Sequence, residues 1–149
     1  MFAVVWVAAG ARTLGRKWFA FLFLSAILIS IGLIYTGTRI APAHPITFNG
    51  KAYGIAVALE AILIVFAVVI LRATNRKQLL LPIISVIVGL HFFGMVPALG
   101  SNLYWWIGGG MSLLSILTMA VLPQKAWAPT VGLGSALILW FAVVGAFFW

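Results

Sequence analysis

Long apolar runs, separated by short polar segments, make up most of this chain. Five of the runs are long enough to cross a membrane, and they cover residues 18–37, 52–71, 79–99, 103–122 and 131–149. Each is close to the roughly 20 residues that a helix needs to span the hydrocarbon of a bilayer. The spans are expected to be helical, because lipid offers no partner to an unpaired backbone group, and the strict alternation of a membrane β-barrel is absent. The pattern predicts an all-α integral membrane protein, a bundle of five transmembrane helices.

The first 17 residues do not fit this pattern. About ten apolar residues come first, and Arg12, Arg16 and Lys17 follow them. A secretory signal would place its positive charges before the apolar run. Ten residues of helix reach only about 15 Å, half of the hydrocarbon core. Residues 1–17 are therefore predicted to form a short cytoplasmic segment with an interfacial or half-inserted helix.

The basic residues between the spans predict how the chain is oriented. With five spans, seven of the nine fall on one side of the membrane, and only Arg39 and Lys51 fall on the other. The seven are Arg12, Arg16, Lys17, Arg72, Arg76, Lys77 and Lys125. Loops rich in Lys and Arg remain in the cytoplasm. The N-terminus is thus predicted to be cytoplasmic and the C-terminus outside, in a multi-pass protein of the inner (cell) membrane of a bacterium.

Composition supports a membrane protein over a soluble one. The chain is 65% hydrophobic and 7% charged, against roughly 25% charged residues in a soluble domain. Residues 1–149 leave no room for a separate soluble domain, so one transmembrane domain is expected. The net charge of +8 does not indicate nucleic acid as a partner, because the basic residues lie in short clusters between apolar runs. With no cysteine, disulfide, thiolate and iron–sulfur chemistry are excluded.

Glu60 is the residue most suggestive of function. It is the only acidic residue in the chain and lies inside the second span, where a carboxylate costs about 2.5–3.5 kcal/mol on insertion scales. His91 lies in the third span, and both side chains are expected about 13 Å below the outer boundary. Ala52, Ala56 and Glu60 share one helical face, so small residues lead down to the carboxyl. A Glu60–His91 pair is therefore possible, and such pairs act either in proton relays or as simple helix fasteners.

Five further residues are candidates for contact with a solute. Trp106, one helical turn from two glycines, could stack on a planar or cationic ligand. Tyr104 and Tyr53 lie near span ends, where aromatic residues also form the interfacial belt. Arg39 could reach Glu60 or extend to the headgroups. Ser112 belongs to a stripe of small residues that either packs against a helix or lines a polar passage.

Metal and cofactor sites are not expected. Glu60 with one or two histidines is a poor site for zinc, which usually takes at least three protein ligands. His44 lies in the outer loop and His91 in a span, so their placement disfavours axial ligation of haem. There is no Asp, no Walker loop and no G-x-S-x-G motif, which leaves hydrolytic and phosphoryl-transfer chemistry little to work with.

Two segments resemble known families. Residues 82–95, PIISVIVGLHFFGM, resemble a signature of small uncharacterised bacterial multi-pass membrane proteins with Gly-Leu-His-Phe in a span, which implies a role for His91 but no activity. Ala-Leu-Glu-Ala around Glu60, with Tyr104, Trp106, Gly108 and Gly110, is similar to the small multidrug resistance transporters. Those have four short spans and exchange protons for cationic drugs at one membrane Glu. The extra first span and His91 depart from that pattern.

Two functions follow from these features. The first is proton-coupled transport of a small cationic or amphipathic solute at Glu60 and His91, by a homodimer, because one five-helix chain encloses little volume. The second is a non-catalytic membrane subunit, or ligand-binding module, that assembles with a larger membrane partner. An intramembrane enzyme using Glu60 and His91 as acid and base is disfavoured, because no residue pattern indicates its substrate.

Overall fold

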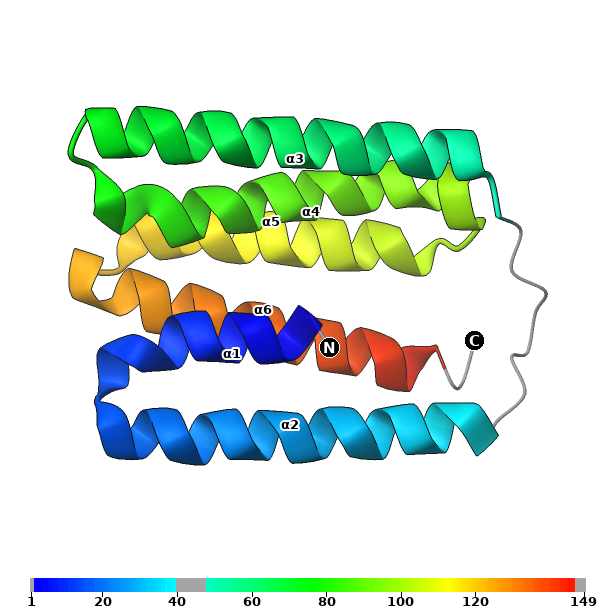
Figure 1. Ribbon diagram of the computed structural model, residues 1–149, viewed down its shortest axis with the longest axis horizontal. Helices are drawn as coiled ribbons and strands as arrows, with labels where there is room; N and C mark the ends of the chain where they lie inside the picture. The colour runs from blue at the N-terminus through cyan, green and yellow to red at the C-terminus, as the bar shows by residue number, and fades with distance from the viewer. Residues whose placement is uncertain (1, 40–47, 147–149) are drawn as a thin grey trace.

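The computed structural model describes residues 2–39 and 48–146, apart from the side chain of Thr38. This part of the chain is a bundle of α-helices with two short 3₁₀ helices and no strand (Figure 1). In chain order the elements are α1 (Phe2–Ala11), η1 (Arg12–Leu14), α2 (Arg16–Arg39), α3 (Gly50–Ala73), η2 (Lys77–Leu79), α4 (Leu80–Leu99), α5 (Leu103–Val121) and α6 (Gln124–Gly145).

The five long helices, α2 to α6, are each long and apolar enough to cross a membrane. The predicted all-α fold with five spans is confirmed, and the first four spans agree with the prediction to within two residues. The fifth differs, because α6 begins at Gln124 instead of residue 131 and includes Pro129. The carbonyl of Lys125, which loses its partner at this proline, lies in the first turn at the end of the bundle, where water can replace the lost bond. Residues 147–149 lie outside the described residues.

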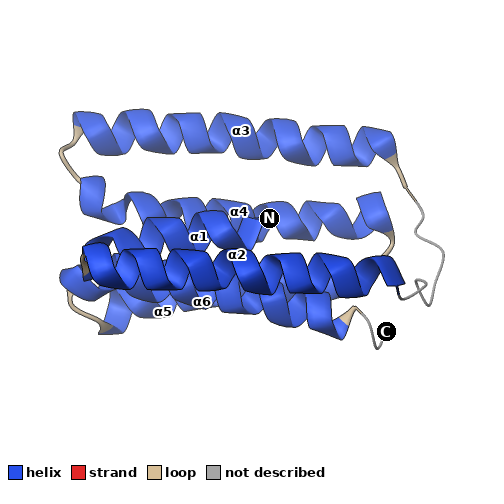
Figure 2. Ribbon diagram, turned by 60° about the horizontal axis from the view of Figure 1, so that its bottom comes forward, coloured by secondary structure: helices blue, strands red, loops and turns tan. Residues whose placement is uncertain are grey.

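The helices form a row with α3 at one edge and α2 at the other (Figure 1). Among the described elements, α3 packs on α4 and α2 packs mainly on α1, while α4, α5, α6 and α1 form the centre. The turned view also shows α3 at the edge of the bundle, beside α4 (Figure 2). The core is made of small and medium side chains such as Ala26, Ile107, Met111, Val131 and Ala136.

The structure contains the predicted short N-terminal helix, and its packing favours the half-inserted alternative over the interfacial one. Helix α1 lies between α2 and α6 and begins about half-way along the bundle (Figure 1). Its buried residues include Trp6 and Gly10. An interfacial helix needs a polar face for the headgroups, and α1 has none. The chain reaches one end of the bundle at Arg12, directly after α1.

Close backbone contact explains why α1 is held inside. Gly10 on α1 faces Gly132 on α6, and a Cβ added to Gly132 would lie 2.5 Å from the Gly10 Cα. Small residues let membrane helices approach until their backbones touch, which increases van der Waals contact. The Gly10–Gly132 contact therefore docks α1 on the last span of the chain.

The outer end of α3 is fixed to α4. Asn49 caps α3, because its side-chain oxygen accepts from the N–H of Ala52 at 3.1 Å, and its own N–H donates to the Ala98 carbonyl at 2.8 Å. Asn49 and Gly50 thus start the helix. His44, in the preceding loop, lies outside the described residues.

The positions of the helix ends show which basic residues lie at the same end of the bundle. The seven basic residues assigned to the cytoplasm all lie at or beside the ends of α1, α3 and α5 and the starts of α2, α4 and α6, which meet at one end of the bundle (Figure 1). Arg39 and Lys51 lie at the opposite end. By the positive-inside rule, the end with the seven charges is expected to face the cytoplasm.

This orientation can be tested with reporter fusions in a bacterial host. A reporter that is active only outside the cytoplasm should be active when fused to the C-terminus and inactive when inserted after Pro123, between α5 and α6. A reporter that is active only in the cytoplasm should give the reverse pattern. A cytoplasmic C-terminus would contradict the charge assignment.

Candidate functional site

The side chains of Glu60 and His91 meet between α3 and α4. The Oε2 atom of Glu60 lies 3.3 Å from Nδ1 of His91. The same Nδ1 lies 3.2 Å from the backbone carbonyl oxygen of Ala56, one helical turn before Glu60. Two acceptors thus face one ring nitrogen, which favours the tautomer with its proton on Nδ1. The contact that the sequence left possible is present in the structure.

Small residues allow the imidazole to reach the backbone of α3. Ala56 on α3 faces Gly94 on α4, and a Cβ added to Gly94 would lie 3.0 Å from the Cβ of Ala56. Gly94 is one helical turn from His91 on the same helix. The two helices are close enough here for the ring to contact the Ala56 carbonyl. The spacing of Ala52, Ala56 and Glu60 in the sequence was the signal for this face.

The pair lies in a narrow groove between two helices. The groove encloses about 190 Å³ and is lined by Ala56, Leu59, Glu60, Leu63, Ile87, Leu90, His91 and Gly94. The His91 side chain is 8% exposed and the Glu60 side chain 21%. All the lining residues come from α3 and α4, and three leucines at the rim are exposed. The carboxyl is therefore sheltered between two helices, at the edge of the bundle instead of its centre.

The aromatic candidates on α5 lie elsewhere. Trp106 is 73% exposed and lines an open hollow with Gly109 and Gly110. Tyr104 stacks on Phe92 at 6.1 Å between ring centroids and lines a second, larger cavity. Neither lines the groove at Glu60.

The remaining candidates are also separate from the pair. Arg39 donates to the Tyr35 hydroxyl at 3.3 Å at the outer end of α2, so it extends along its own helix. Tyr53 lies near the start of α3 against Phe48, with ring centroids 5.6 Å apart. Ser112 faces α4, where a Cβ on Gly89 would meet its hydroxyl. Within the described residues its Oγ is buried without a hydrogen-bond partner, in a close helix contact.

The site offers a carboxyl and an imidazole, which can form hydrogen bonds with each other or with a ligand. Within residues 2–39 and 48–146, no three His, Cys, Asp or Glu side chains come together. A cation in the groove would lie beside the one acidic side chain of the sequence. Comparisons with protein-family models, with curated proteins and with solved structures give no match to this chain.

Proposed function

We propose that this multi-pass membrane protein exchanges protons at the Glu60–His91 pair and couples that exchange to transport of a small cationic or amphipathic solute. One observation carries the proposal: the sole acidic residue of the chain lies on a membrane-spanning helix and contacts an imidazole at 3.3 Å. A carboxyl at such depth is expensive to insert, and Gln would fasten the helices at lower desolvation cost. The presence of Glu instead of Gln at position 60 therefore favours a function that uses the proton of the carboxyl.

The lining of the groove favours a solute that enters from the lipid bilayer. Its walls are mostly leucine and isoleucine, with the carboxylate and imidazole at the bottom. An amphipathic cation has an apolar part that fits such walls and a charge that fits the carboxylate. This chemistry is similar to that implied by the resemblance to small multidrug resistance transporters, although Tyr104 and Trp106 are not in the groove.

A second copy of the chain is part of this proposal. The groove has walls from two helices, and α3 is in contact mainly with α4, so one chain does not enclose a passage. Many apolar side chains of α3 face outward, among them Ile55, Leu59, Ile62 and Phe66. A partner helix packed on this face would enclose the groove, as expected for a homodimer in the inner membrane.

The alternative function, a membrane subunit, is favoured by a different observation. Arg39, Tyr53, Tyr104, Trp106 and Ser112 do not converge on Glu60. If the protein is a subunit, the exposed face of α3 docks on a larger membrane protein, and Glu60 and His91 hold α3 on α4. Purification in mild detergent would then yield a stoichiometric larger partner.

Proton flux in proteoliposomes tests the proposal. With a pH-sensitive dye inside and a lipophilic cationic dye outside, the parent protein should dissipate a proton gradient faster than empty liposomes. Glu60→Gln should reduce the flux to the level of empty liposomes, because Gln keeps the shape but carries no exchangeable proton.

The control variant is Lys125→Gln, which removes a charge at the cytoplasmic end of α6. It should retain the flux of the parent. Equal flux by the parent and Glu60→Gln would contradict the proposed mechanism, and absence of flux from the parent together with a co-purifying partner would favour the subunit.

A further inference from the structure

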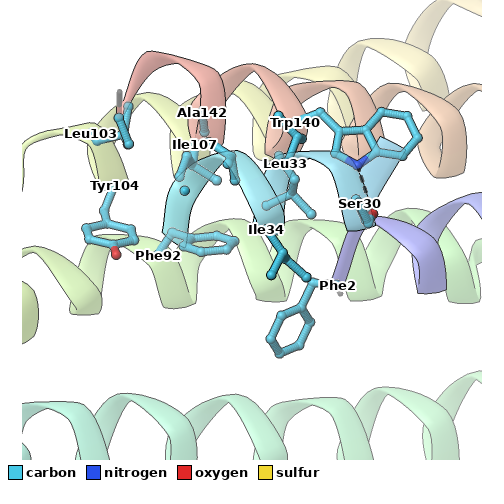
Figure 3. A pocket seen from close by; sticks show the side chains of 15 residues that line it. Phe2, Ser30, Leu33, Ile34, Phe92, Leu103, Tyr104, Ile107, Trp140 and Ala142 are labelled. Carbon is cyan, nitrogen blue, oxygen red and sulfur yellow. Dashed lines mark hydrogen bonds between the residues drawn. The ribbon is translucent and has the colours of Figure 1, made fainter. Parts of the chain in front are cut away.

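The structure has a cavity beside the start of α1. Helix α1 begins at Phe2, half-way along its neighbours, whereas α2, α4, α5 and α6 continue to the outer end. A cavity of about 470 Å³ lies beyond the start of α1 (Figure 3). This volume is in the range of roughly 300–1,000 Å³ that is typical of small-molecule sites.

The wall of the cavity is apolar and comes from five helices. It includes Phe2 of α1, Leu33 and Ile34 of α2, Phe92 of α4, Ile107 of α5 and Trp140 of α6 (Figure 3). Among the described residues, no charged side chain lines it. A cavity of this kind stays free of water, because a buried water needs two to four polar partners.

The polar groups in the wall are few. The indole N–H of Trp140 donates to the Ser30 hydroxyl at 3.3 Å (Figure 3), so these two groups bond to each other. Tyr104 lies in the first turn of α5, at the outer end, where the lipid headgroups begin. Tyr and Trp are common at this depth because one end of the ring is apolar and the other polar. The interior therefore offers a polar solute little, and the one polar group near its outer end lies at headgroup level.

The cavity has an open side toward the lipid. Helix α2 is held mainly by α1 and only lightly by α6, and α4 is not among the described elements that it packs on closely. Beyond the start of α1, the space between α2 and α4 is therefore open to the surrounding bilayer. The surrounding medium at this depth is hydrocarbon.

From these features we infer that the cavity binds one hydrocarbon chain of an outer-leaflet phospholipid, whose headgroup lies near Tyr104. A hydrocarbon chain fits this cavity better than a polar solute does, because the described wall supplies apolar contacts and no charge. The site shares no lining residue with the Glu60–His91 groove. It is therefore independent of the proposed transport and can be tested without it.

Native mass spectrometry of the protein purified in mild detergent provides the test. The parent should retain one phospholipid per chain through exchange into detergent. Ala142→Phe places a ring in the cavity and should reduce the retained lipid to background. Val144→Phe, on an exposed residue of the same helix that does not line the cavity, should retain as much lipid as the parent.

A second pair of variants keeps the test valid if Ala142→Phe does not fold. Leu33→Trp fills the cavity from α2 and should also lose the lipid, whereas Leu28→Trp, on an exposed residue of the same helix, should not. A parent without bound phospholipid, or folded filling variants that retain as much as their controls, would overturn the inference.

Discussion

Gly132→Ala should detach α1 from the bundle and lower the stability of the protein by about 3 kcal/mol, the upper part of the usual range for overpacking. The added Cβ would lie 2.5 Å from the Cα and 2.7 Å from the nitrogen of Gly10, and 2.7 Å from the carbonyl oxygen of Trp6. All three atoms belong to the backbone of α1, so no side-chain rotation relieves the clash. The helices must separate.

Two other glycines provide matched comparisons. At Gly10 the nearest atoms to an added Cβ are at 3.0–3.2 Å, so Gly10→Ala should have a smaller effect. At Gly109 nothing lies within 4 Å. Gly109→Ala should be neutral or stabilising, because Ala is favoured over Gly in helices by about 1 kcal/mol.

Thermal unfolding in detergent would measure the stability of the three glycine variants. A cysteine on α1 would report directly whether the helix is docked. The chain contains no cysteine, so Ala11→Cys, at a fully buried position near the cytoplasmic end, introduces a single thiol. It should be unreactive to maleimide in the parent and reactive when combined with Gly132→Ala. If Gly132→Ala unfolds at the same temperature as Gly109→Ala, the backbone contact does not hold α1.

The bundle was predictable because it depends on quantities that a sequence contains. Span length sets helix number, and the positions of basic residues set which ends share a side. The sequence also showed that Glu60 and His91 could meet, because consecutive antiparallel helices place residues at matching distances from one end of the bundle at the same depth. Counting along the helices left open whether the two side chains touch, because it does not give the rotation of either helix.

The position of α1 was not predictable in this way. Ten apolar residues fit an interface or a half-depth insertion equally well, and the choice depends on Gly132, more than a hundred residues away. The separation of Trp106 and Tyr104 from Glu60 depends on the rotation of α5 about its axis. In helices that are apolar on nearly every face, periodicity does not fix that rotation. The cavity beside Trp140 was also hidden, because it results from what α1 leaves unfilled.

The second large effect is expected from His91→Leu, which leaves the Glu60 carboxyl without its imidazole. Removing one partner of a buried ion pair typically costs about 3–5 kcal/mol, because the other charge is left uncompensated. Glu60 is at the edge of the bundle, so we expect the lower end, about 3 kcal/mol. The loss of stability should be measured by unfolding in detergent against the parent.

Making His91→Leu in a Glu60→Gln background separates the energy of the Glu60–His91 interaction from the other effects of removing the imidazole. With an amide in place of the carboxyl no charge is left behind, and His91→Leu loses mainly the contacts of the ring with the Ala56 carbonyl and the amide. Such bonds between membrane helices are worth about 0.6–1.7 kcal/mol. The double-mutant cycle should therefore give a coupling energy of about 1–2 kcal/mol between Glu60 and His91. Additive effects would show that the two side chains do not interact.

The cycle also separates fastening from proton exchange. If the pair only fastens α3 to α4, the proton flux in liposomes should fall in proportion to the stability of each variant. Glu60→Gln should then keep most of its stability and most of its flux, because the amide can still form a hydrogen bond with the imidazole. If Glu60 exchanges protons, Glu60→Gln should keep most of its stability and lose its flux. A variant that is nearly as stable as the parent but carries no flux is therefore the result that assigns the carboxyl to function, because fastening alone cannot produce it.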